Sequence, residues 1–156
     1  MLIEEYQALH SFRYQIRLFL HFSEEAAKAE GLEPQQHQML LAIRALEAPH
    51  GPTVGMLAAH LLIRHHSAVG LLDRLAGRQL VERVRGSGDR RQVCIRLTAE
   101  GERKLETLSE VHSAELRRSG PALVDALAGL LGRLDGGGPP EANREGNVEQ
   151  DEGCHP

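Results

Sequence analysis

Apolar side chains recur every three or four residues along the first part of the chain, which is the spacing of amphipathic helices. The first such segment, from about residue 2 to 29, carries one apolar stripe formed by Leu2, Tyr6, Leu9, Phe12, Ile16 and Phe19. Leu18, Leu20 and Phe22 lie outside this stripe, so the predicted helix is apolar on more than one side. We expect it to pack both within its own domain and against a second copy of the chain; burial in a helical bundle is the alternative.

Shorter helical segments follow, separated by turn residues. Pro34 suits the first position of a second helix. After the loop at 48–52, Thr53 is expected to cap a third helix over 54–61, and a fourth helix is predicted over about 64–78. The inner side of this fourth helix would be formed by Ala68, Leu71, Leu72 and Leu75.

The apolar spacing then changes to two, the period of a β-strand. Residues 80–84 and 92–97 alternate as two short strands, and the polar, glycine-bearing loop 85–91 joins them. A short helix, a tight turn, a second helix and a two-stranded hairpin with a basic loop form the layout of a winged helix-turn-helix. The expected fold is therefore mainly α with a small β wing.

The C-terminal part is predicted to be helical and then disordered. Thr98 is expected to cap a fifth helix, which Gly120 and Pro121 would interrupt, and a sixth helix is predicted over 122–134. From residue 135 onward almost no apolar side chain remains, so burial cannot offset the entropy of ordering the chain. We expect residues 135–156 to be a disordered acidic tail.

Composition is that of an ordinary globular protein of one domain: 156 residues, 41% hydrophobic and 26% charged. No apolar run is long enough for a membrane span, and the first residues do not resemble a signal peptide, so a cytoplasmic location and no membrane partner are expected. Aromatic residues make up only 3% and all lie within the first 22 positions, which argues against stacking of single-stranded bases elsewhere in the chain.

The net charge of −4 hides a strong separation along the chain. Residues 64–96 carry a net charge of +5, and every base among them is an arginine, whose planar fork suits phosphates and guanine edges. Residues 135–156 carry −5. Placement of charge therefore indicates double-stranded DNA as a partner, although the total does not.

The fourth helix is the candidate for the DNA major groove, and the hairpin tip is the candidate for an adjacent minor groove. The first turn of the fourth helix holds His65, His66 and Ser67. The side opposite the apolar face carries His66, Gly70, Asp73 and Gly77, flanked by Val69 and Arg74.

At these positions the sequence resembles the MarR family of bacterial transcription regulators. The resemblance rests on Met56-Leu57-Ala58-Ala59-His60-Leu61, Leu71-Leu72-Asp73-Arg74-Leu75, Leu80-Val81-Glu82-Arg83, Asp89-Arg90-Arg91 and Arg96-Leu97-Thr98-Ala99-Glu100-Gly101. It implies a domain over 1–134, in which 30–100 form the winged-helix core. Residues 1–29 and 101–134 would be dimerisation helices that interlock with those of a second copy.

The resemblance also implies site residues and a function. The DNA-binding set would be Arg64, His65, His66, Ser67, Arg74, Arg85, Asp89, Arg90 and Arg91, with Asp89 orienting Arg91 for the minor groove. The protein would be a homodimeric repressor on a pseudo-palindromic operator, with recognition helices about 34–36 Å apart. A small aromatic or anionic effector could relieve repression near Tyr6, Phe12, Tyr14 and Phe19, although core packing explains these rings as well.

Three positions depart from the family pattern and bear on the operator sequence rather than on the class of protein. Arg64 stands where a small polar cap is usual, and Gly70 stands where an arginine is frequent. Gln79 replaces the glycine that commonly ends this helix, which predicts strain in the turn before Leu80.

Other functions have weaker support in the sequence. Nine histidines suggest metal sensing, but none is paired at a ligand spacing on one element, although His37 and His112 could approach each other in a dimer. Cys94 and Cys154 do not indicate a redox sensor, and no catalytic or cofactor fingerprint appears, so neither an enzyme nor a cofactor is expected. The main alternative is a dimeric ligand-binding or protein-interaction module that keeps the fold and binds DNA weakly.

Overall fold

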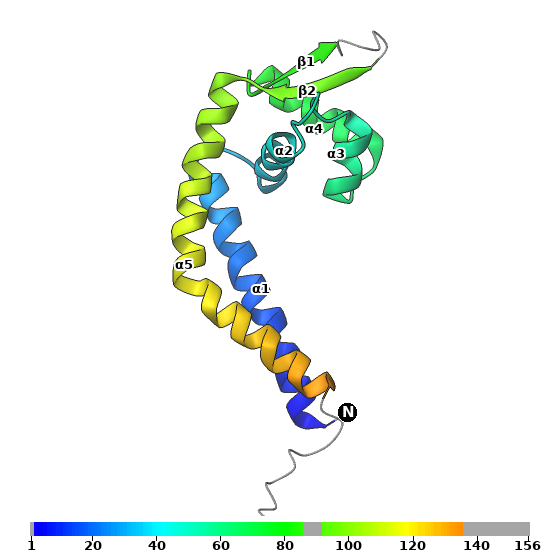
Figure 1. The fold of residues 1–156 in the computed structure, drawn as a ribbon. Coiled ribbons are helices and arrows are strands. Elements are labelled where there is room, and N and C mark those ends of the chain that lie inside the picture. The colour runs from blue at the N-terminus through cyan, green and yellow to red at the C-terminus, as the bar shows by residue number, and fades with distance from the viewer. Residues whose placement is uncertain (1, 86–91, 136–156) are drawn as a thin grey trace, which may run out of the picture.

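The computed structural model describes residues 2–85 and 92–135, which form a long stem and a small lobe (Figure 1). The elements in chain order are α1 (Ile3–Ala29), α2 (Pro34–Ala45), α3 (Val54–Leu61), α4 (His65–Gly77), β1 (Val81–Arg85), β2 (Val93–Leu97) and α5 (Ala99–Asp135). Helices α1 and α5 lie side by side as the stem, and α2, α3, α4 and the hairpin form the lobe at one end (Figure 1). The mainly α fold with a small β wing is confirmed.

Local sequence signals set most of these boundaries. Thr53 caps α3 by accepting a hydrogen bond from the Met56 N–H at 3.3 Å, and Thr98 caps α5 by accepting one from the Gly101 N–H at 3.1 Å. Strands β1 and β2 pair antiparallel, with Val81 opposite Leu97 and Arg85 opposite Val93. The two caps and the hairpin lie where the sequence predicts them.

The predicted break at Gly120 and Pro121 is wrong, because α5 is a single helix that continues through Pro121 to Asp135. Proline removes one backbone donor and bends a helix without necessarily ending it. Figure 1 shows that α5 bends in its middle and then follows α1 along the stem. Contact with α1 on both sides of the bend, including burial of Leu130, holds the two halves in one helix.

The lobe is held together by a core to which every one of its elements contributes. Its most deeply buried large side chains are Met39, Leu40, Ile43, Leu57, Leu71, Leu72, Leu75, Leu80 and Ile95. The buried residues of α4 are Ala68, Leu71, Leu72 and Leu75, so the inner side of the fourth helix is as predicted. Burying each such aliphatic side chain contributes about 1.5–3 kcal/mol.

The lobe meets the stem where α5 begins. The Thr98 N–H donates to the Leu80 carbonyl at 3.1 Å, and the Thr98 hydroxyl donates to the Gln79 carbonyl at 2.7 Å. Gln79 has a positive φ of 59°, so the strained turn expected before Leu80 is present. At Gly101 the backbones come so close that an added Cβ would lie 2.1 Å from the Leu80 carbonyl oxygen.

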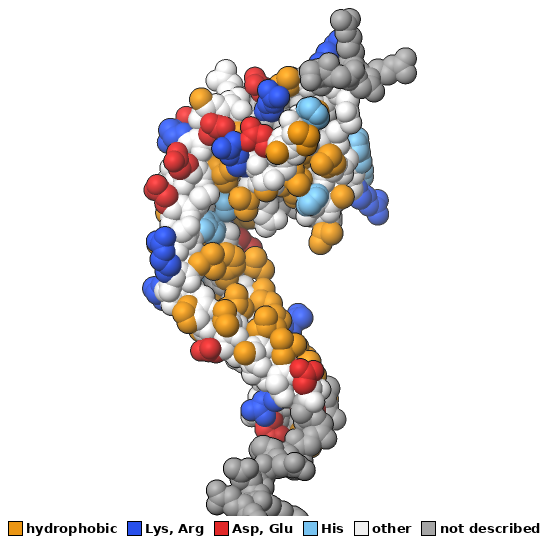
Figure 2. Space-filling view, in the orientation of Figure 1, with side chains coloured by type: hydrophobic (Ala, Val, Ile, Leu, Met, Phe, Trp, Pro, Cys, Tyr) orange, Lys and Arg blue, Asp and Glu red, His pale blue; other side chains and the backbone are white. Residues whose placement is uncertain are grey.

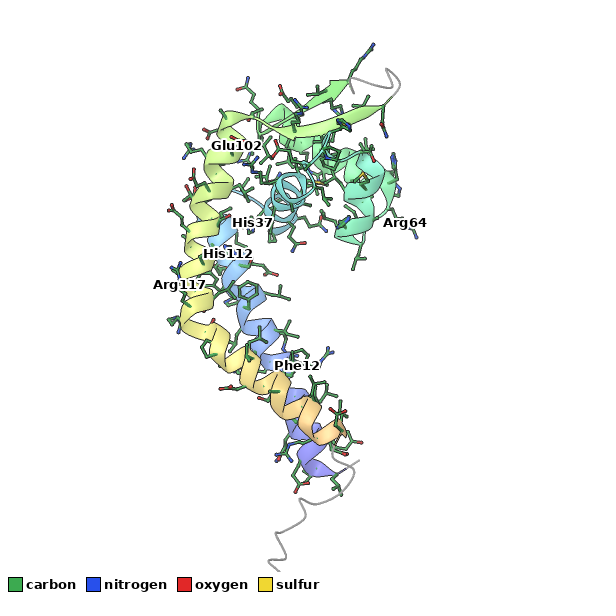
Figure 3. All side chains as sticks on the ribbon, in the orientation of Figure 1. Phe12, His37, Arg64, Glu102, His112 and Arg117 are labelled. Carbon is green, nitrogen blue, oxygen red and sulfur yellow. The ribbon has the colours of Figure 1, made fainter. Side chains whose placement is uncertain are left out.

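Two histidines make a second contact between lobe and stem. The ring of His37 on α2 lies 4.8 Å from that of His112 on α5, between ring centroids, and His37 is only 5% exposed. The ring nitrogens of His112 are hydrogen-bonded to the Leu108 carbonyl at 2.7 Å and the Ser23 hydroxyl at 2.8 Å. The expected approach of the two histidines therefore occurs within one chain and does not need a dimer (Figure 3).

We predict that Gly101→Ala destabilises the protein by at least about 2 kcal/mol, because the new methyl group must displace backbone at Leu80 rather than a flexible side chain. Urea unfolding followed by circular dichroism measures the change. Gly132→Ala is the matched control, since it lies in the same helix with nothing within 4 Å, and it should stabilise the protein by up to about 1 kcal/mol. Equal stabilities for the two variants would contradict the close contact.

A second prediction concerns pH. Burial, together with the nearby His112, lowers the pKa of His37 from 6.5 to about 4. The unfolded state therefore binds a proton at this residue before the folded state does, so the stabilisation is complete above about pH 6.5 and is lost as the pH falls toward 4. The free energy of unfolding should decrease by up to about 1.4 kcal/mol per pH unit in this window on account of His37.

Urea unfolding of wild type and His37→Gln across pH 4–7.5 tests this expectation. The difference between the two proteins should shrink as the pH falls, because the variant carries no titrating group at this position. His60→Gln, which alters an exposed histidine of α3, should leave the pH profile of the wild type unchanged. Parallel profiles for wild type and His37→Gln would show that the pKa of His37 is the same in the folded and unfolded states.

Candidate nucleic-acid interface

The outward side of α4 is fixed by the burial of its inward side. With Ala68, Leu71, Leu72 and Leu75 in the core, the first turn of the helix faces solvent. The predicted DNA-binding residues of this helix are all exposed, namely Arg64, His65, His66, Ser67 and Arg74 (Arg64 is labelled in Figure 3). The structure therefore places five of the nine predicted residues at exposed positions of one element, four of them at its N-terminal end.

The N-terminus of α4 is also open to an anion. Arg64 is the N-cap residue, and its side chain accepts no hydrogen bond from the first turn, since a guanidinium has no acceptor. Backbone N–H groups at the start of a helix that lack an internal acceptor suit phosphate oxygens, and the helix dipole adds to the attraction. Arg64 thus places a positive charge at the N-terminus of α4, at the position where a small neutral capping residue is usual.

The turn before α4 contains a feature that the sequence reasoning missed. Leu62 ends α3 in the left-handed conformation, with φ of 55° and ψ of 39°, and its side chain is 93% exposed. Such a conformation costs a leucine about 1–2 kcal/mol, and glycine or asparagine is the usual choice. The half-buried Ile63, whose N–H donates to the Ala58 carbonyl at 3.0 Å, holds this tight turn in place.

The wing lies beside α4 and is joined to it by an ion pair that the sequence did not reveal. Arg83 on β1 donates to the Asp73 carboxylate on α4 at 2.7 Å. Arg85, one of the predicted wing residues, is the last residue of β1, and its side chain is exposed. The other three wing residues, Asp89, Arg90 and Arg91, lie outside the described residues.

The aromatic residues expected near an effector do not form one site. Tyr6 and Tyr14 are about half exposed, Phe12 and Phe19 are half-buried, and the four follow the length of α1. Phe19 alone of this set lines a cavity of about 530 Å³ between α1 and the bend of α5.

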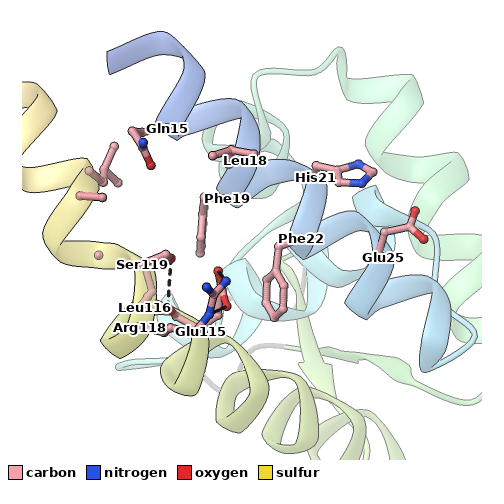
Figure 4. A pocket seen from close by; sticks show the side chains of 13 residues that line it. Gln15, Leu18, Phe19, His21, Phe22, Glu25, Glu115, Leu116, Arg118 and Ser119 are labelled. Atoms are coloured by element: carbon pink, nitrogen blue, oxygen red, sulfur yellow. Dashed lines mark hydrogen bonds and ion pairs between the residues drawn. The ribbon is translucent and has the colours of Figure 1, made fainter. Parts of the chain in front are cut away.

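That cavity has an apolar wall and a charged rim. Phe19, Phe22 and Leu116 contribute apolar surface, and Glu115 and Arg118 form a bidentate ion pair beside it, with distances of 2.8 and 3.0 Å (Figure 4). Phe19 and Phe22 also meet the His112 ring edge-on, with centroids 6.0 and 5.6 Å apart. The cavity is therefore adjacent to the histidine contact between stem and lobe.

Residues 2–85 and 92–135 contain no group of three or more His, Cys, Asp or Glu side chains placed to hold a metal ion. In the same residues, no helix is both long and apolar enough to span a bilayer.

Comparison with known proteins agrees with this geometry. The MarR family model matches residues 30–92. Transcriptional activatory protein BadR of Rhodopseudomonas palustris is 32% identical over 98 residues, which cover 62% of this chain and 56% of that protein. The matched part of the chain thus spans little more than half the length of this relative.

Solved structures share the fold. A mutant of MarR from E. coli in complex with operator DNA superposes with a TM-score of 0.62 at 22% identity, over 79% of this chain and 87% of that one. CouR from Rhodococcus jostii, bound to p-coumaroyl-CoA, gives 0.60 at 25% identity, over 80% and 88%. Residues 30–92, which hold the winged helix-turn-helix of this chain, are thus similar to the MarR family, and the solved structures share the fold of the whole described chain.

Proposed function

We propose that the protein is a transcription regulator that binds double-stranded DNA as a homodimer. The observation that carries this proposal is the exposed first turn of α4, with Arg64 at its cap and Arg74 behind it, held beside the wing by the Asp73–Arg83 ion pair. A helix of this kind fits the major groove, where the base pairs can be told apart. A known relative is named as a transcriptional activatory protein, and a similar structure was solved with operator DNA.

Within this proposal the residues have distinct roles. His65, His66 and Ser67 in the first turn face base edges, while Arg64 and the helix N-terminus meet a phosphate. Arg85, Arg90 and Arg91 belong to the wing, where Asp89 would orient Arg91 toward a minor groove. The arginine-rich segment 64–96, with its charge of +5, supplies the attraction to the DNA backbone.

We predict that affinity for a random duplex falls steeply with salt, with log K decreasing by about 0.9 per neutralised phosphate for each unit of log salt concentration. Removal of residues 135–156 should strengthen binding, because it removes a charge of −5 that competes with phosphate for the arginines. Fluorescence anisotropy across a salt series measures both effects. Weak binding with a flat salt response in both proteins would favour the alternative, a ligand-binding or protein-interaction module with little DNA affinity.

The dimer is proposed from an apolar surface that the single chain leaves exposed on the stem (Figure 2). Its residues are Leu2, Ile3, Tyr6, Leu9, Tyr14, Leu18 and Leu20 on α1, and Val111, Leu116, Val124, Leu127, Leu131 and Leu134 on α5. So much contiguous apolar surface is unusual for a monomer and typical of an interface. The two apolar sides expected of the first helix are accounted for if one contacts α5 and the other a second copy.

Val124→Glu should convert the dimer to a monomer without unfolding the chain, because this side chain is 64% exposed in the single chain and the new charge would be buried only in the dimer. DNA affinity should fall by about 100-fold or more, since each monomer then binds one half-site without its partner. Sedimentation equilibrium and anisotropy measure the two effects. Arg117→Ala, on the side of α5 away from α1 in Figure 3, is the control and should change neither; a dimeric Val124→Glu variant would place the interface elsewhere.

The cavity between α1 and α5 is the proposed site for an effector. Its apolar wall suits an aromatic ring, and a similar structure, CouR, was solved with p-coumaroyl-CoA. Arg118 is the basic side chain on its rim, although Glu115 already engages it. We predict that the protein represses transcription when its operator overlaps a promoter, and that a bound ligand relieves this repression. The relative BadR, by contrast, is named as an activatory protein.

A further inference from the structure

Gly70 lies on the outward side of α4, one turn before Arg74. A Cβ added at Gly70 would lie 3.7 Å from Nη1 of Arg74, so the guanidinium extends back over this position. Helical side chains point toward the N-terminus of their helix, which brings a residue at i+4 over a residue at i. The missing side chain at position 70 therefore leaves a space in the outer surface of α4 that the arginine fork occupies.

No acidic group within the described residues holds Arg74 there. Its neighbour Asp73 is engaged by Arg83 at 2.7 Å, and Arg74 takes part in none of the ion pairs formed among residues 2–85 and 92–135. The Asp73–Arg83 pair thus neutralises the one acid of this helix that could attract Arg74. The donors of the Arg74 fork stay available to an acceptor outside the protein.

The place of this fork on the helix decides what it can reach. His66 and Gly70 follow one row on the outward side of the N-terminal half of α4, which is the part of a recognition helix that enters deepest into a groove. An arginine at the helix edge meets a phosphate, but a fork that lies over this central row is directed at base edges. Guanine, with O6 and N7 side by side, is the base that accepts both bonds of such a fork.

We infer that Gly70 is a specificity-determining residue, because it opens the space through which Arg74 reads a guanine near the middle of the recognition helix. This inference rests on the proposed DNA-binding function. The inference also accounts for the glycine at position 70, where an arginine is frequent in the family pattern. Arg74, one turn further along the helix, supplies the guanidinium that an arginine at position 70 would have supplied.

The second glycine of α4 provides a matched control. Gly77 is the last residue of the same helix, about 10 Å further along its axis, and has nothing within 4 Å of an added Cβ, whereas a Cβ added at Gly70 would contact Arg74. Replacing either glycine by glutamine improves helix propensity by a similar amount. Only the change at position 70 fills the space taken by the guanidinium.

The experiment first selects the preferred duplex of the full-length wild-type protein from a random pool. It then measures affinity for this site, for each single base-pair substitution of it, and for random duplex. Arg74→Ala and Gly70→Gln should each reduce the ratio of selected to random affinity by about 5- to 150-fold, which corresponds to the 1–3 kcal/mol of one bidentate contact. Both should lose the preference for guanine at the same single position of each half-site.

Gly70→Ala should keep the ratio within about twofold, since a contact of 3.7 Å is an ordinary one, and Gly77→Gln should do the same. The double variant Gly70→Gln/Arg74→Ala should be no worse than either single variant, because both remove one contact. Thermal unfolding checks that Gly70→Gln is at least as stable as wild type, so that lost specificity is not lost folding.

Several results would overturn the inference. A loss in Arg74→Ala that is equal for every sequence would assign Arg74 to a phosphate, and a Gly70→Gln variant with wild-type base preferences would show that the space is not used. Additive losses in the double variant would show that the two residues act separately. If wild type itself fails to select any sequence or to bind duplex DNA, the proposed function fails instead, which is a different outcome.

Discussion

The burial of one side of α4 in the lobe core is the constraint on which the proposed DNA-binding surface depends. Leu71, Leu72 and Leu75 are almost completely buried, and this fixes both the position of the helix and its rotation about its own axis. Rotation by one residue, about 100°, would bring Asp73 or Arg74 toward the core, where an unpaired charge costs several kcal/mol. The polar residues of α4 therefore need no specific contact to face outward. Two of the outward positions can be glycine without changing the orientation of the helix.

The contacts between the lobe and the stem differ in how much movement they allow. Gly101 against the Leu80 carbonyl is a steric contact between backbones and allows little movement. The ring contact between His37 and His112 joins two side chains and can yield. The hinge of the molecule is thus expected where α2 meets the stem rather than where α5 begins.

Sequence patterns predict the elements of this fold well because each has a local signal. The caps at Thr53 and Thr98, the alternation of residues 80–84 and the apolar side of α4 all act within a few residues of one another. The break predicted at Pro121 fails because packing of α5 along α1 outweighs a local preference. The close approach of His37 and His112, the left-handed Leu62 and the Asp73–Arg83 pair could not be predicted, since each depends on residues that only the folded chain brings together or on a conformation that leucine rarely adopts.

Phe19 and Phe22 suggest how the two ends of the molecule communicate. Both rings line the cavity of the stem, and both meet the edge of the His112 ring, which in turn lies against His37 on α2. Because a packed interior does not deform continuously, a ligand that displaces either phenylalanine must also move His112 or be excluded. In the proposed dimer, movement of His112 would act on α2, which shares its core with α4, and would thereby change the spacing of the two recognition helices although the ligand lies far from DNA. Helix α2 is therefore the element through which occupation of the stem would alter the affinity for an operator.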